Sequence, residues 1–87
     1  MKLKKLMHDF LQDYLDQNKI EFSEWSVNVN KQEGFGDYSS NIALKLAKIL
    51  KKAPIEIAEN IAIHPNASEN VFTLSASQPG FVNFHIS

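Results

Sequence analysis

Residues 36–52, GDYSSNIALKLAKILKK, join a glycine turn, two serines and an amphipathic helix in one uninterrupted segment. Ser39 or Ser40 is predicted to cap the helix, because a serine oxygen accepts a free backbone N–H at a helix start. Leu44 falls on the polar side and is expected to be exposed. The apolar residues form a continuous arc on the other side of the helix, and such an arc must be buried against a core. The arc consists of Ile42, Ala43, Leu46, Ala47, Ile49 and Leu50.

The polar side of this helix carries four lysines: Lys45, Lys48, Lys51 and Lys52. One interpretation is the solvated face of an amphipathic helix. The other is a contact with nucleic-acid phosphates that does not depend on base sequence. The two are compatible, and Lys45, Lys48 and Lys52 are the candidate phosphate contacts.

Two further helices are predicted. Apolar residues recur every three or four positions over Lys2–Gln17, which is typical of a core-facing helix. Pro54 suits the first turn of a helix whose buried stripe includes Ile57 and Ile61.

Strands are predicted on either side of the central helices. Alternation over Glu24–Asn30 places Trp25, Val27 and Val29 on one face, and residues 35–38 form a short return strand. Asn70–Ala76 and Phe81–Ile86 form a second pair, joined at Pro79–Gly80 by residues typical of a type II turn. We therefore expect an α+β fold in two layers, a small antiparallel sheet with helices packed on one face.

Composition limits the function. The 87 residues make a single domain, 1–87, with nine lysines, no arginine, no cysteine and net charge −1. This charge argues against gripping duplex DNA. No apolar run approaches the roughly 18 residues of a membrane span, and a cytoplasmic location is expected. No histidine spacing or loop motif indicates a metal site or a catalytic centre, and a solvated face is the preferred interpretation of Asp9, Asp13 and Asp16.

The last strand carries the most specific signal. Val82, Phe84 and Ile86 are predicted to face the core, which leaves Phe81 exposed beside Asn83 and close to Gln78. An exposed aromatic ring flanked by amides is how several RNA-binding modules hold an unpaired base. The alternative is that Phe81 covers the next segment of chain.

Three segments resemble arginyl-tRNA synthetases, in their N-terminal additional domain. The first, residues 36–48, is similar to a Gly-Asp-Tyr-(small)-(small)-Asn-(aliphatic)-Ala motif. The second, residues 54–62, is similar to Pro-x-x-Ile-Ala-x-x-Ile. The third, residues 79–84, resembles the Gly-Pro-Gly-Phe-Ile-Asn-Phe that closes the domain, and the chain departs from the family just before it, at Ser77 and Gln78.

The resemblance implies an α-β-β-α-β-β sandwich that binds the D-loop at the outer corner of tRNA(Arg). It implies that Phe81 stacks on a base, that Asn83 pairs with its edge and that Gln78 assists. It also implies a longer, monomeric arginine–tRNA ligase that uses ATP and Mg²⁺, of which this chain is a fragment without catalytic residues or cofactor. Its partners would be tRNA(Arg) and the remaining synthetase chain, with neither DNA nor a membrane. The alternative is a free-standing RNA- or protein-interaction module with Leu44 and Phe81 as apolar anchors; a small enzyme in its own right is a third hypothesis.

Overall fold

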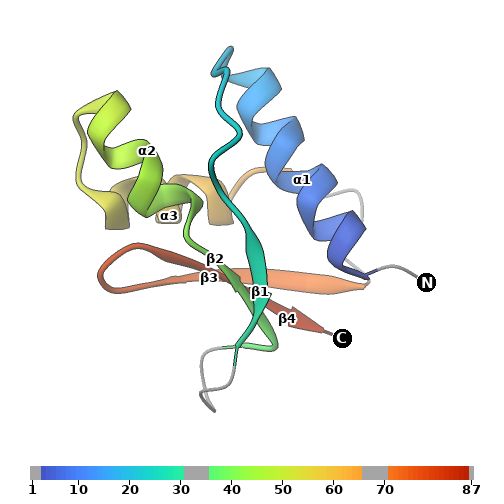
Figure 1. The fold of residues 1–87 in the computed structure, drawn as a ribbon. Helices are drawn as coiled ribbons and strands as arrows, with labels where there is room; N and C mark the ends of the chain where they lie inside the picture. The colour runs from blue at the N-terminus through green and yellow to red at the C-terminus, as the bar shows by residue number, and fades with distance from the viewer. Residues whose placement is uncertain (1–2, 31–35, 66–70, 87) are drawn as a thin grey trace.

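The computed structural model describes residues 3–30, 36–65 and 71–86. In these residues three helices lie on one side of a four-stranded antiparallel sheet (Figure 1). The predicted two-layer α+β fold is confirmed. The predicted starts at Lys2, Phe35 and Asn70 lie outside the described residues. The elements are α1 (Leu3–Gln17), β1 (Val27–Val29), β2 (Tyr38–Ser40), α2 (Ile42–Leu50), α3 (Pro54–Ala62), β3 (Phe72–Ser77) and β4 (Phe81–Ile86).

The sheet has the strand order β1-β2-β4-β3, so the last strand of the chain lies inside it. β4 pairs with β3 in a hairpin and with β2 on its other side. Directly opposite residues of antiparallel strands share a face. The register therefore places Ser40, Val82 and Ala76 in one row and Ser39, Asn83 and Ser75 in the neighbouring row, on the other face.

The core lies between the helices and the sheet. Phe10 of α1 contacts Phe72 and Phe84 of the sheet edge to face, at ring-centroid distances of 6.2 and 6.3 Å. Phe72 and Phe84 lie 5.2 Å apart in the same geometry, which aromatic pairs prefer. The predicted stripes of the helices are confirmed by their buried members: Met7, Phe10, Leu11, Tyr14 and Leu15 in α1, Ile42, Ala43 and Leu46 in α2, and Ile57, Ala58 and Ile61 in α3.

Four predicted burial states are wrong at the borders of the core. Val29 is 63% exposed, because β1 is an edge strand of only three residues. Ile49, assigned to the buried arc, is 52% exposed, and Ile86 at the end of β4 is 40% exposed. Leu44, expected to be exposed, is half-buried. Periodicity identifies the face of an element but not how far its neighbours extend over that face.

The start of α2 differs from the predicted cap. Ser39 and Ser40 belong to β2, and Asn41 occupies the N-cap position without a side-chain capping bond. Ser40 still serves the helix, since its buried hydroxyl accepts the backbone N–H of Ile42 at 3.1 Å. The Asn41 side-chain oxygen instead accepts the backbone N–H of Ser26, which ties the segment before β1 to α2.

The predicted type II turn at Pro79–Gly80 is wrong. That turn requires a positive φ at its second central residue, and among the described glycines only Gly36 has one, at +90°. Gly80 is buried, and a glycine is required there for a steric reason. A Cβ at this position would lie 2.4 Å from the Cβ and 2.9 Å from the carbonyl carbon of Pro54. A residue without a side chain is therefore needed for the hairpin to reach the start of α3.

No helix in the described ranges has the length and apolarity needed to cross a membrane.

Candidate functional site

The candidate site lies on the sheet face opposite the helices. A row of polar side chains crosses all four strands there: Asn28 of β1, Ser39 of β2, Asn83 of β4 and Ser75 of β3. Along β4, Phe81 and His85 lie two residues to either side of Asn83 and point to the same face. The site therefore combines an aromatic ring with amide, hydroxyl and imidazole groups.

Phe81 and Asn83 are adjacent on this face, as the alternation predicts, but less exposed than expected. Phe81 is half-buried and Asn83 is 2% exposed. Asn83 occupies the middle of the sheet, where neighbouring strands and its own strand surround it with side chains. The Asn83 amide nitrogen donates a hydrogen bond to the Ser77 hydroxyl at 3.0 Å.

The backbone at Gly36 covers part of this face. A Cβ at Gly36 would lie 2.9 Å from the carbonyl oxygen of Phe84, 3.3 Å from the His85 ring and 3.4 Å from the Asn83 Cβ. The next residue, Asp37, fixes the approach, since its backbone N–H donates to the Phe84 carbonyl and its carboxylate accepts the N–H of Ile86, each at 2.8 Å. Gly36 and Asp37 therefore shape the rim of the site.

His85 and Ser75 form the second polar pair of the face. The His85 Nε2 lies 2.8 Å from the Ser75 hydroxyl. This pair and the Asn83–Ser77 pair use separate partners, so the two serines of β3 anchor different side chains of β4.

Gln78 lies at the end of the hairpin, beside Phe81. It is exposed, and the Gln78–Pro79 peptide bond is cis. The contact of Gly80 with Pro54 holds this turn against α3. The three predicted base-binding residues thus follow one another from the turn into β4, with Phe81 between the exposed Gln78 and the buried Asn83 in the chain.

The three candidate phosphate contacts do not all belong to α2. Lys45 and Lys48 are exposed on α2, three residues apart on one helix face. Lys52 lies beyond the end of α2, which stops at Leu50 and is followed by Lys51 with φ +55°. The helical spacing that groups Lys52 with the other two on the sequence is therefore broken by the end of the helix.

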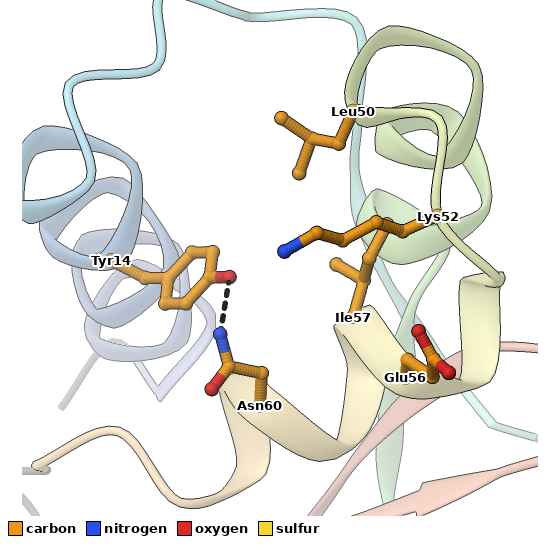
Figure 2. Close-up of a pocket in the computed structure, with 6 residues that line it drawn as sticks. All are labelled: Tyr14, Leu50, Lys52, Glu56, Ile57 and Asn60. Atoms are coloured by element: carbon orange, nitrogen blue, oxygen red, sulfur yellow. Dashed lines mark hydrogen bonds between the residues drawn. The ribbon is translucent and has the colours of Figure 1, made fainter.

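Lys52 instead lines a pocket on the helical side of the molecule (Figure 2). The pocket has a volume of about 260 Å³, and the Asn60 amide donates to the Tyr14 hydroxyl within it at 3.2 Å. Figure 2 shows the Lys52 ammonium directed toward that pair. Sequence reasoning did not find this pocket, because Tyr14 is there simply one member of an apolar stripe. Its lining residues are Tyr14, Leu50, Lys52, Glu56, Ile57 and Asn60.

The acidic residues of α1 have local partners. Lys5 donates to Asp9 at 2.8 Å, and this hydrogen bond holds the pKa of Asp9 below its ordinary value. Asp13 pairs with the His64 ring at 2.8 Å and Asp16 accepts from Gln12. Within the described residues no group of three potential ligands is arranged to hold a metal ion.

Sequence reasoning missed the serines that complete the site. Ser77 was noted only as a departure from the family pattern, yet it holds the Asn83 amide. Ser39 was assigned to a helix start but lies in β2 beside Asn83. The available signal was the alternation of β3, which places Ser75 and Ser77 on one face.

Comparison with known proteins identifies relatives of this chain. The family model for the arginyl-tRNA synthetase N-terminal domain matches residues 1–86. An arginine–tRNA ligase of Desulforamulus reducens is 39% identical over 79% of this chain, and one of Staphylococcus carnosus is 43% identical over 77%. The chain spans 12% of the length of each of these two relatives.

A solved structure, the arginyl-tRNA synthetase of Thermus thermophilus, has the same fold. It superposes with a TM-score of 0.83 over 98% of this chain and 14% of that protein, at 22% identity. With a family match over nearly every residue, the chain belongs to the arginyl-tRNA synthetase N-terminal domain family.

Proposed function

We propose that this chain is the tRNA-binding N-terminal domain of an arginyl-tRNA synthetase, and that it holds the D-loop at the outer corner of tRNA(Arg). The rest of the enzyme would join arginine to the tRNA with ATP and Mg²⁺. The synthetase would act as a cytoplasmic monomer. The catalytic step is assigned to the remaining chain, since the relatives are several times longer than these 87 residues.

The observation that carries the proposal is that Phe81 and Asn83 lie next to each other along β4, on the sheet face without helices, in a chain of this family. The Phe81 ring offers a surface on which an unpaired base stacks, and the Asn83 amide offers hydrogen bonds to the base edge. Gln78, exposed at the adjoining turn, is the third contact. Lys45 and Lys48 on α2 and the exposed Lys52 beyond its end are available for phosphates.

The burial of Asn83 defines how the base must approach. With only 2% of the residue exposed, the base would reach the amide from the Phe81 side after the ring has moved to stack on it. Side-chain rotations of this kind are common when partners bind. The backbone of β4 would stay fixed, since both neighbouring strands pair with it.

The test uses the full-length synthetase with Phe81→Ala and, separately, Asn83→Ala. Aminoacylation kcat/KM is measured with tRNA(Arg) and with transcripts in which the D-loop bases are replaced one at a time. Loss of stacking should cost about 1–3 kcal/mol in kcat/KM for the native tRNA, mainly through KM for tRNA. At one D-loop position the variants should no longer distinguish the native base from its replacements.

Ile63→Ala is the matched control, because Ile63 is an apolar residue 80% exposed after α3 and outside the proposed site. It should behave as wild type. If both site variants discriminate D-loop bases as well as wild type does, the proposed function is wrong.

A further inference from the structure

The Asn83 amide is held by a hydrogen bond from its nitrogen to a serine of the neighbouring strand. Its nitrogen donates to the hydroxyl of Ser77, the last residue of β3, at 3.0 Å. Ser77 lies directly opposite Phe81 in the hairpin, while Ser75 lies directly opposite Asn83. The anchoring bond therefore runs diagonally across the strand pair, between side chains that share one face.

The oxygen of the same amide is the acceptor left for a ligand, while the nitrogen uses one of its two N–H groups on Ser77. Across the described part of the chain, no buried side-chain nitrogen or oxygen is without a hydrogen-bond partner. Among the described residues, the side-chain hydrogen bond of Asn83 uses its nitrogen. The oxygen must therefore retain contact with solvent, within the 2% of the residue that is exposed.

We propose that Ser77 is a positioning residue for base recognition: its hydroxyl holds the Asn83 amide so that the oxygen faces the RNA base. This inference rests on the proposed function. The terminal torsion of asparagine is broad and roughly two-fold, so an unanchored amide presents its oxygen and its nitrogen alternately. With the anchor in place, the site accepts a hydrogen bond, and it favours a base whose edge offers an N–H donor.

Ser77 would thus affect which base is chosen more than whether RNA binds. Stacking on Phe81 does not depend on the orientation of the amide, because every base has a face that stacks. Loss of the anchor should therefore lower the discrimination between D-loop bases while leaving most of the affinity for tRNA.

An isosteric pair of variants in the full-length synthetase tests this inference. Ser77→Thr keeps the hydroxyl and Ser77→Val replaces it with a methyl group, and both residues are favoured in strands. The quantity measured is the ratio of kcat/KM for native tRNA(Arg) to that for a transcript with the sensitive D-loop base replaced. Ser77→Val should lower this ratio about two- to tenfold, as expected for one hydrogen bond, and Ser77→Thr should retain it.

Thr73→Val is the matched control. Thr73 lies on the same strand and face, is exposed, and stands opposite His85 rather than Asn83 or Phe81, so its variant also exchanges a hydroxyl for a methyl group but outside the proposed contacts. It should keep the discrimination ratio.

The outcomes separate this inference from the proposed function. If Phe81→Ala and Asn83→Ala both leave the ratio unchanged, the proposed function fails; if Asn83→Ala alone leaves it unchanged, the role of Ser77 is refuted. If Asn83→Ala lowers the ratio but Ser77→Val does not, or if Thr73→Val lowers it as much as Ser77→Val, the role of Ser77 is refuted. Equal ratios for the Thr and Val variants, both below wild type, would also refute it, because the hydroxyl would then not be the active group.

Discussion

Replacing Gly80 with alanine tests the contact that joins the hairpin to the helices. The added Cβ would lie 2.4 Å from the Pro54 Cβ and 2.9 Å from its carbonyl carbon, where ordinary contact begins at 3.4 Å. The turn would have to move by about 1 Å. Because part of the overlap is with backbone, we take the upper half of the usual overpacking penalty, about 2–3 kcal/mol.

Alanine also reduces the conformational freedom of the unfolded chain, which stabilises by about 0.4–1 kcal/mol where the native φ suits it. Gly80 does not have a positive φ, so this gain applies. The expected net loss is about 1–2.6 kcal/mol in the free energy of unfolding. For a domain of this size each kcal/mol lowers Tm by about 4–8 °C.

Urea denaturation and thermal melting of the chain measure the effect, with Gln78→Ala as the control. Gln78 is exposed in the same turn, and its replacement should stay within about 0.5 kcal/mol of wild type. The sign of the change in unfolding free energy for Gly80→Ala tests the close contact between Gly80 and Pro54. A variant more stable than wild type would mean that there is room for a side chain beside Pro54 and that the contact is wrong.

Three further predictions concern stability, each measured by urea denaturation. Ile42→Val should lower the free energy of unfolding by about 0.5–1.5 kcal/mol, because Ile42 is fully buried in α2. Ile49→Val in the same helix, at a 52% exposed position, should lower it by less than about 0.5 kcal/mol. Equal losses would contradict the orientation of α2. His64→Ala should cost about 1–2 kcal/mol, because its ring pairs with Asp13 and contacts Phe10 and Tyr14, and should exceed the cost of His8→Ala, whose exposed ring only stacks on Trp25 and lies near Asp9. Ser40→Ala should cost about 1–2 kcal/mol through the lost bond to the Ile42 N–H, and an unchanged midpoint would show that the bond contributes nothing.

The layers of the fold could be predicted because long elements repeat their pattern several times. The stripe of α1 repeats over several turns, and the structure confirms it. In β4 the buried Val82 and Phe84 agree with the predicted alternation, but Asn83 is buried as well and Ile86 is exposed. Short elements offer no such agreement. β1 and β2 have three residues each, and their bounds depend on which strand pairs with which, a property of distant residues.

The candidate site could be located from the sequence, but its internal bonds could not. Alternation alone put Phe81 and Asn83 on one face. The burial of Asn83 depends on side chains from Ser75 and Ser39, which are brought beside it by the register of three strands. The grouping of Lys52 with Lys45 and Lys48 has a similar limit. Helical spacing places residues on one face only while the helix continues, and α2 ends at Leu50.

The positions of the proposed base contacts follow from the core rather than from a loop. Asn83 lies on a strand whose alternate residues, Val82 and Phe84, are fully buried, and that strand has a paired neighbour on each side. Any movement of the Asn83 backbone would disturb this packing. Phe81 begins the same strand, next to a turn that Gly80 fixes against Pro54. A domain with net charge −1 has little electrostatic attraction to RNA to offer, so the proposed tRNA contact would depend on the placement of a ring and an amide. The same reasoning explains why the site lies on the sheet: binding groups held by strands are positioned more accurately than groups on loops.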